Sequence, residues 1–125
     1  MTVFLTVDDV IRIHDDEKRC ALLDRGKLEA AVAQPSFALA DGVFLYPSVF
    51  LQAAVLLHRI ATAHAFEDAN KRTAWLCCVV FLRLNQVSMR PDLDQHEIAD
   101  FVVDVVVQHR TLEDIAVDLA AMALS

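Results

Sequence analysis

The sequence predicts a single all-α domain of about six helices around one central apolar helix, with a short flap or hairpin. Hydrophobic residues make up 56% of the 125 residues and charged residues 23%, so the chain has enough apolar side chain to form a core. Only two glycines and three prolines interrupt it, which argues against the many turns of a β-sandwich or barrel. No linker-like stretch divides residues 1–125, and we expect one domain.

Two helices are expected in the N-terminal part of the chain. Thr6 is a good N-cap, and apolar residues recur behind it at helical spacing, which predicts a first helix that runs to about Leu23. Gly26 opens a second helix, Lys27 to Ala33. This helix is expected to stop at Pro35, because proline restricts the residue before it and cannot continue the backbone hydrogen bonding.

The next segment, Gln34 to Tyr46, mixes strand-forming residues with the Asp-Gly pair 41–42, which is the hairpin signal of this sequence. It predicts a flap or short hairpin. Pro47 is then expected at the first position of a third helix. One wide apolar stripe characterises this helix, formed by Val49, Phe50, Ala53, Ala54, Leu57, Ile60 and Ala61.

The helix from Asn70 to Leu84 is apolar on nearly all sides and is predicted to be the central one. A fifth helix follows Pro91, and a sixth starts at Thr111, with Asp114 placed for a capping box. The valine-rich run 102–107 has the propensity of a buried strand, but polar residues around it recur at a spacing of three to four and favour a helix.

Charge and composition exclude several classes of protein. The net charge of −7 argues against wholesale nucleic-acid binding, because phosphate neutralisation needs clustered Lys and Arg. The longest uncharged run, Gly42 to Leu57, has 16 residues and contains Pro47, so it is too short and too interrupted to span a membrane. The first residues lack a basic start followed by a long apolar core, so no signal peptide is expected. The three cysteines do not have the pattern of a disulfide framework, so a reducing cytoplasm is expected.

The segment His64 to Arg72 (HAFEDANKR) concentrates polar side chains at the start of the most apolar helix. Unpaired N–H groups of a first helical turn bind anions, and the side chains of Lys71 and Arg72 add cationic donors for phosphate oxygens. Asp68 would be a hard oxygen ligand for Mg²⁺, and His64 can accept a proton near neutral pH. Taken singly, each of these residues is more simply interpreted as a helix cap or as surface charge.

Taken together, these residues resemble the Fic motif, HxFx[DE]GN[GK]RxxR. Six positions match, namely His64, Phe66, Asp68, Asn70, Lys71 and Arg72. Ala69 replaces the first glycine, Lys71 stands where AMP-transferring members have glycine, and Trp75 replaces the final arginine. HxFxxANKR is similar to the form in the Doc branch of the Fic/Doc family, as are IHDD at 13–16, LYP at 45–47 and FLRLN at 81–85. The loss of the final arginine at Trp75 is consistent with a changed phosphate arrangement, and the alternative is that Trp75 is only a core residue.

The resemblance implies a role for each matching position. His64 would be the general base that activates a Ser or Thr hydroxyl of a target protein, and Phe66 would anchor the loop in the core. Asp68 would hold Mg²⁺. The phosphates of ATP would bind to Asn70, Arg72 and the backbone near Ala69. Lys71 is associated in Doc-like members with a reversed nucleotide that presents its γ-phosphate, which implies a kinase.

At the level of the whole protein, the resemblance implies a Doc-like toxin of a toxin–antitoxin pair that phosphorylates a cytoplasmic protein, with elongation factor Tu as the implied target. The alternatives are AMP transfer, as in Fic proteins generally, and a catalytically silent helical binding module. No [ST]xxxE[GN] stretch of the kind that inhibits Fic proteins internally is present, so a Phd-like antitoxin is the expected restraint. Gln34 to Tyr46 would be the flap that aligns a target segment as an added strand, or an ordinary loop.

Other candidate residues have no role assigned at this stage. His58, His96 and His109 lack paired-ligand spacing and are expected to be ordinary helix residues, so no zinc site is expected. Cys20, Cys77 and Cys78 are expected to be small buried side chains. His14 and Asp15 belong to the family-like IHDD stretch but have no evident mechanism.

Overall fold

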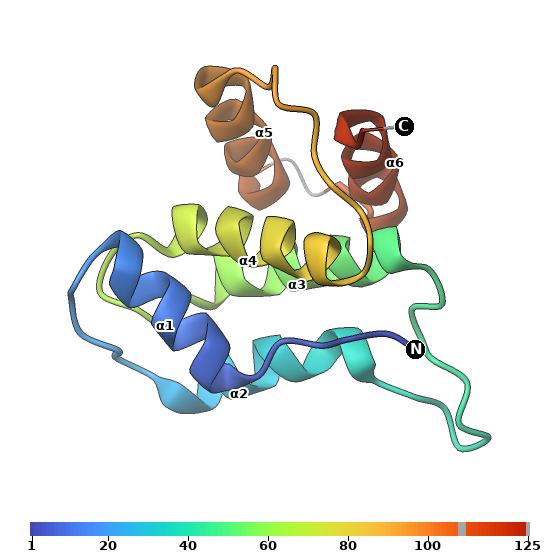
Figure 1. Ribbon diagram of the computed structural model, residues 1–125. Coiled ribbons are helices and arrows are strands. Elements are labelled where there is room, and N and C mark those ends of the chain that lie inside the picture. Colours follow the sequence, from blue (N-terminus) through green and yellow to red (C-terminus); the bar gives the residue numbers. More distant parts are fainter. Residues whose placement is uncertain (108–109, 125) are drawn as a thin grey trace.

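The computed structural model describes residues 1–107 and 110–124, and the chain is helical over most of that range (Figure 1). The elements are α1 (Val7–Glu17), α2 (Arg25–Ala33), the short 3-10 helix η1 (Gln34–Ser36), α3 (Val49–Ala63), α4 (Asn70–Leu84), α5 (Gln95–Val107) and α6 (Leu112–Met122). Among these described residues, β-structure is limited to isolated bridges. The predicted all-α domain of about six helices is confirmed.

α3 and α4 lie side by side at the centre of the molecule, with α1 and α2 on one side of the pair and α5 and α6 on the other (Figure 1). α4 is the central helix that the sequence predicted, and α3 shares this position. Their contact faces supply fully buried side chains, including Leu56, Leu57 and Ile60 of α3 and Cys77, Cys78 and Phe81 of α4. Burying each large side chain of this kind stabilises the fold by roughly 1.5–3 kcal/mol. Across the two described ranges, no helix is long and apolar enough to cross a bilayer.

Side-chain caps explain where most helices begin. Thr6 and Asp9 form a reciprocal capping box at α1. The backbone N–H of Asp9 donates to the Thr6 hydroxyl at 3.1 Å, and the backbone N–H of Thr6 donates to the Asp9 carboxylate at 2.9 Å. Thr111 caps α6 as predicted, because its hydroxyl accepts a hydrogen bond from the backbone N–H of Asp114 at 3.0 Å. The valine-rich run 102–107 is helical, as its polar flanks indicated.

Three predicted helix boundaries were wrong. α1 ends at Glu17 rather than near Leu23, because the backbone that follows is extended and bonds to a distant loop instead of continuing the helix. α2 begins at Arg25, one residue before Gly26, because Asp24 caps it. α3 begins at Val49 rather than at Pro47. Ser48 is its N-cap, and the Ser48 hydroxyl accepts from the N–H of Leu51 at 3.1 Å.

The predicted hairpin is present between η1 and α3. Ala38 and Phe44 form an antiparallel bridge, and the N–H of Leu39 donates to the carbonyl of Val43 at 2.8 Å. Gly42 lies at the turn with φ of +85°, a left-handed conformation that glycine adopts without strain. The Asp-Gly pair therefore predicted this turn correctly.

Candidate active site

His64 ends α3 and begins the loop that leads into α4. It adopts a left-handed conformation with φ of 51°, which turns the chain sharply after the helix. Its side chain is exposed and makes no hydrogen bond or ion pair within residues 1–107 and 110–124. An accessible imidazole without an internal partner is free to accept a proton from a bound hydroxyl.

Phe66 anchors this loop in the core, as the sequence predicted. Its side chain is 2% exposed, and its backbone forms a bridge with Leu22 in the extended segment that follows α1. Asn70 closes the loop from the other side. Its carboxamide oxygen accepts from the N–H of Phe66 at 3.1 Å, and its carboxamide nitrogen donates to the Phe66 carbonyl at 2.9 Å. The Asn70 side chain thus holds the loop, and its backbone N–H is the group left for a phosphate.

The first turn of α4 lacks a side-chain cap. Ala69, its N-cap residue, is left-handed with φ of 63° and ψ of 24°, where an alanine costs about 1–2 kcal/mol more than a glycine. The backbone N–H groups of residues 70–72 have no hydrogen-bond partner within the described chain, and the first bond of the helix runs from Thr73 to the Ala69 carbonyl at 2.9 Å. This arrangement is a backbone anion site, and the helix dipole adds to its attraction for phosphate.

Asp68 lies beside that turn, and its carboxylate is held from two sides. One oxygen accepts from the N–H of Ala69 at 2.7 Å, and the other pairs with the ammonium group of Lys18. The hydrogen bond from Lys18 lowers the pKa of Asp68, and the bond from Ala69 lowers it further, so this carboxylate stays ionised at neutral pH.

An ionised, exposed carboxylate next to a backbone anion site fits Mg²⁺. The described residues contain no group of three or more His, Cys, Asp or Glu side chains that could hold a metal by themselves. Mg²⁺ is usually held by one or two carboxylates together with substrate phosphates and water. The Asp68 carboxylate at the α4 terminus is suited to be the protein ligand in such a set.

The two cations of the motif have different surroundings. The Nε atom of Arg72 lies 2.8 Å from a carboxylate oxygen of Glu17, the last residue of α1. Lys71 is exposed and has no ion-pair partner among the residues that the structure describes. Lys71 is therefore the cation that is available to a phosphate at the α4 terminus, whereas Arg72 also ties α4 to α1.

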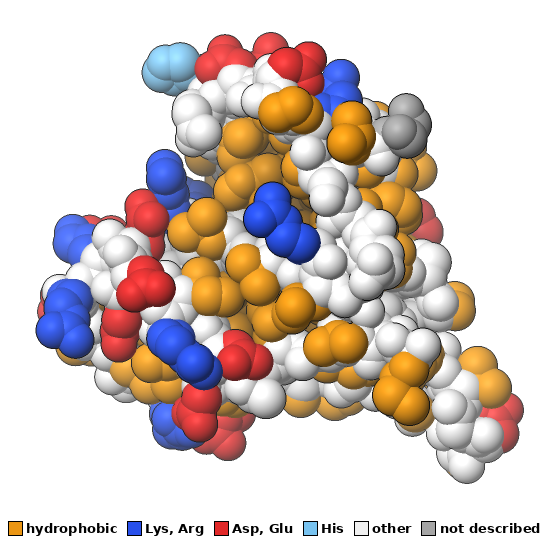
Figure 2. Space-filling view, in the orientation of Figure 1, with side chains coloured by type: hydrophobic (Ala, Val, Ile, Leu, Met, Phe, Trp, Pro, Cys, Tyr) orange, Lys and Arg blue, Asp and Glu red, His pale blue; other side chains and the backbone are white. Residues whose placement is uncertain are grey.

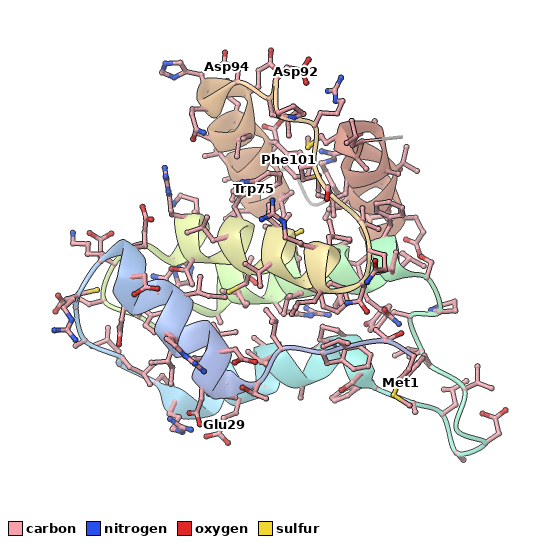
Figure 3. All side chains as sticks on the ribbon, viewed as in Figure 1. Met1, Glu29, Trp75, Asp92, Asp94 and Phe101 are labelled. Carbon is pink, nitrogen blue, oxygen red and sulfur yellow. The ribbon has the colours of Figure 1, made fainter. Side chains whose placement is uncertain are left out.

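A cavity of about 290 Å³ adjoins this terminus between α4 and α5. Hydrophobic side chains gather in this recess, as Figure 2 shows, and Lys71 and Arg72 contribute to its lining. Its remaining wall is formed by Trp75, Leu76, Gln95, Ile98, Ala99, Val102 and Val103. Trp75 is 9% exposed and packs edge-to-face on Phe101 with ring centroids 6.2 Å apart (Figure 3), so it acts as a core residue where the Fic motif has its last arginine.

A second segment, residues 18–24 after α1, runs along the loop and fixes it. The N–H groups of Leu23 and Asp24 both donate to the Ala65 carbonyl, at 2.7 Å and 3.1 Å. The N–H of Glu67 donates to the Ala21 carbonyl at 2.9 Å. Because these partners are more than 40 positions apart in the chain, sequence spacing alone could not reveal them.

His14 is the residue of this site to which sequence analysis assigned no mechanism. It is fully buried at the C-terminal end of α1, and its ring stacks on Phe66 with centroids 3.7 Å apart and planes 9° from parallel. The signal that could have found it was a histidine at helical spacing on the apolar face formed by Val10 and Ile11.

Of the other histidines and the cysteines that the structure describes, Cys20 is the one that lies at this site. His58 and His96 are helix residues on α3 and α5, as expected, and burial lowers the pKa of His58, with a further contribution from Arg59. His109 lies outside the described residues. Cys77 and Cys78 are buried free thiols, as expected, but Cys20 is half-buried, and its sulfur lies 3.4 Å from Nε2 of His14.

The hairpin lies away from His64. This position does not fit the role of a flap that aligns a target segment. Phe44 of the hairpin packs on Phe4 with centroids 5.6 Å apart, and Phe4 in turn lies 6.0 Å from Phe81 near the end of α4. The 15 residues of α3 separate this end of the molecule from the loop, a length of about 22 Å (Figure 1). The ordinary-loop alternative agrees better with this placement.

Comparison with known proteins agrees with the motif. The family model described as the Fic/DOC family matches residues 4–82, which extend from the start of the chain to near the end of α4. A similar protein is "Toxin Doc" of Mycolicibacterium smegmatis, which is 41% identical over 100 residues, or 80% of this chain and 76% of the relative. The matched residues include the whole loop and the segment that fixes it. The chain therefore belongs to the Fic/Doc family.

Proposed function

We propose that this chain is the toxin of a toxin–antitoxin pair and acts as a kinase, transferring the γ-phosphate of ATP to a Ser or Thr hydroxyl of a cytoplasmic protein. Elongation factor Tu is the proposed target, so the consequence is inhibition of translation. The observation that carries the proposal is the exposed imidazole of His64, which has no partner among residues 1–107 and 110–124, on the loop that leads into the uncapped first turn of α4. The similarity to a relative named "Toxin Doc" supports the toxin role.

The reaction assigns one task to each group. His64 removes the proton from the acceptor hydroxyl, whose oxygen forms a bond to the γ-phosphorus while the bond to the ADP oxygen breaks. The N–H groups of residues 70–72 and the Lys71 ammonium hold the phosphate oxygens. Asp68 would hold Mg²⁺, and the bound ion would neutralise charge between the transferred phosphate and the remaining phosphates.

Lys71 favours phosphate transfer over AMP transfer. Its side chain stands at the start of the phosphate-binding turn, where glycine would leave room for a nucleotide to bind in the opposite direction. Lys71 also supplies a cation for the terminal phosphate, which carries the most charge.

The restraint on this activity is proposed to be a Phd-like antitoxin. The sequence contains no [ST]xxxE[GN] stretch that could block the nucleotide site from within the chain. Expression of the chain alone should therefore arrest bacterial growth, and co-expression of the partner should relieve the arrest. Harmless expression of a chain that is active on its target in vitro would contradict the need for a partner.

A labelling experiment tests the activity. The purified chain is incubated with Mg²⁺ and cell lysate together with ATP labelled at either the γ- or the α-phosphate. Label transferred from the γ-phosphate supports the kinase, label from the α-phosphate supports the AMP transferase, and no label supports a silent binding module. A folded His64→Ala variant is the control, and it should lose about 10²-fold or more of either transfer, because the base is removed.

A further inference from the structure

His14 is a buried histidine whose two ring nitrogens both have partners. Its side chain is 0% exposed, Nδ1 lies 3.1 Å from a carboxylate oxygen of Asp15, and Nε2 lies 3.0 Å from the backbone carbonyl oxygen of Asp68. A carbonyl oxygen only accepts hydrogen bonds, so Nε2 is the donor in the contact with Asp68. This bond joins residues 54 positions apart and connects α1 to the loop at residues 64–69 that leads into α4.

The ring of His14 also fixes the loop through its face. It lies almost parallel to the Phe66 ring, with the ring centroids 3.7 Å apart. Phe66 is itself 2% exposed, and its backbone N–H and carbonyl are both bonded to the Asn70 carboxamide. The imidazole therefore contacts the loop at two points, the side chain of Phe66 and the carbonyl of Asp68. Two contacts on a rigid, buried ring define both the position and the rotation of the loop.

The contact with the Asp68 carbonyl extends to the Asp68 carboxylate. The carbonyl and the N–H of Ala69 belong to one planar peptide group. That same N–H donates to a carboxylate oxygen of Asp68 at 2.7 Å. A bond that fixes the Asp68 carbonyl therefore also fixes the Ala69 N–H, which orients the Asp68 carboxylate. It also holds the left-handed conformation of Ala69, from which the uncapped turn of α4 starts.

We propose that His14 is a positioning residue of the active site, which orients the peptide between Asp68 and Ala69 so that the Asp68 carboxylate and the first turn of α4 face the same Mg²⁺-bound phosphates. This inference rests on the proposed function for its ligands, but the loop geometry can be tested without them. His14 does not touch the reacting atoms. Replacing His14 therefore acts indirectly, by changing the orientation of Asp68. In other proteins, residues that are hydrogen-bonded to metal ligands affect metal affinity in the same indirect way.

Two variants separate the contributions of His14. His14→Phe keeps an aromatic face for Phe66 but removes the donor to the Asp68 carbonyl, whereas His14→Gln keeps an amide donor and removes the ring. Val10→Ala is the matched control, because Val10 is also 0% exposed and lies one turn earlier on the same helix. Thermal unfolding of all three variants shows how much general stability each has lost.

The first measurement uses ADP with Mg²⁺ as the probe and follows its affinity through the backbone amide NMR signals of residues 69–72. We expect His14→Phe to weaken Mg²⁺-dependent ADP binding by about ten- to a hundredfold, His14→Gln to recover part of that loss, and Val10→Ala to stay within about twofold of wild type. Equal affinities of wild type and His14→Phe would overturn the inference. So would an equal loss in Val10→Ala, because the effect would then be one of stability only.

The second measurement needs no nucleotide. Hydrogen exchange of the Ala69 amide should be faster in His14→Phe than in Val10→Ala at matched stability, because only the former releases the peptide plane. Unchanged exchange at Ala69 would overturn the inference even if the wild-type chain proved not to bind ADP. Failure of the wild-type chain to bind ADP or transfer a phosphate would instead contradict the proposed function.

Discussion

The side chains of Lys18 and Asp68 pair across the gap between the end of α1 and the start of α4, so that a lysine outside the motif neutralises the proposed Mg²⁺ ligand. This pairing lowers the pKa of Asp68 and raises that of Lys18. Both side chains are more than half exposed, so solvent screens the pair and its contribution to stability is small.

Lys18→Met should raise the pKa of Asp68 toward 3.8, its ordinary value. The sign follows from linkage: a carboxylate with a lowered pKa contributes stability above its unfolded pKa and loses this contribution as the pH falls through the folded pKa. A ¹³C NMR titration of the carboxyl groups measures the shift. Asp9 is the internal control, because its pKa is lowered chiefly by the backbone N–H of Thr6 and should not change. An unchanged Asp68 midpoint would mean that the pair is not populated in solution.

Lys71→Gly should reduce γ-phosphate transfer strongly and permit some AMP transfer, because it removes a cation and opens space at the proposed phosphate-binding turn. Rates with γ- and α-labelled ATP measure the two reactions. Arg83→Gly is the matched control, since it places a glycine at another exposed position of α4, far from the loop. Each substitution should cost about 1 kcal/mol of helix stability. Full kinase activity of folded Lys71→Gly would refute the orientation argument and leave the family assignment intact.

Ala69→Gly should stabilise the protein, by about 1 kcal/mol, because glycine adopts the left-handed conformation of this position without the strain of a Cβ atom. Urea unfolding measures the difference in the free energy of unfolding. The same substitution at Ala30, an exposed residue within α2, should have the opposite sign and cost about 1 kcal/mol. A destabilised Ala69→Gly variant would show that Ala69 is not left-handed in solution.

Replacing the exposed hairpin residues Leu39 and Val43 by asparagine should leave the affinity for ADP with Mg²⁺ and the KM for the acceptor protein within about twofold of wild type. The reason is the length of α3, about 22 Å, between the hairpin and His64. Isothermal titration and initial rates measure the two quantities. An increase of tenfold or more in the acceptor KM would show that the hairpin does contact the acceptor.

Much of the fold follows from local patterns in the sequence. The bounds of α4 were predicted from apolarity and the polar ends of the helix, and the hairpin turn from its Asp-Gly pair. The end of α1 was missed because the residues after Glu17 have helical spacing, yet their backbone groups find better partners in the loop at residues 65–67. Local propensity does not contain such long-range hydrogen bonds.

The sequence likewise identified some residues of the candidate site and missed others. His64, Asp68 and Lys71 were identified from their order in the motif, and the structure brings them to the junction of α3 and α4. The contacts of His14 and Lys18 were not foreseen, because their partners lie 54 and 50 positions later in the chain. A motif names the residues that meet a ligand, whereas the residues that support them come from wherever the fold brings the chain close.

The segment at residues 18–24 determines which part of the molecule unfolds together with the loop at residues 64–69. Its backbone bonds and the contacts of His14 join the loop at residues 64–69 to α1, whereas α3 packs on both α5 and α6. Partial unfolding that detaches only residues 1–24 would dismantle the loop while most of the core stayed folded. The lifetime of the competent site is then set by this sub-global opening, and activity should be lost on warming before the helical signal is.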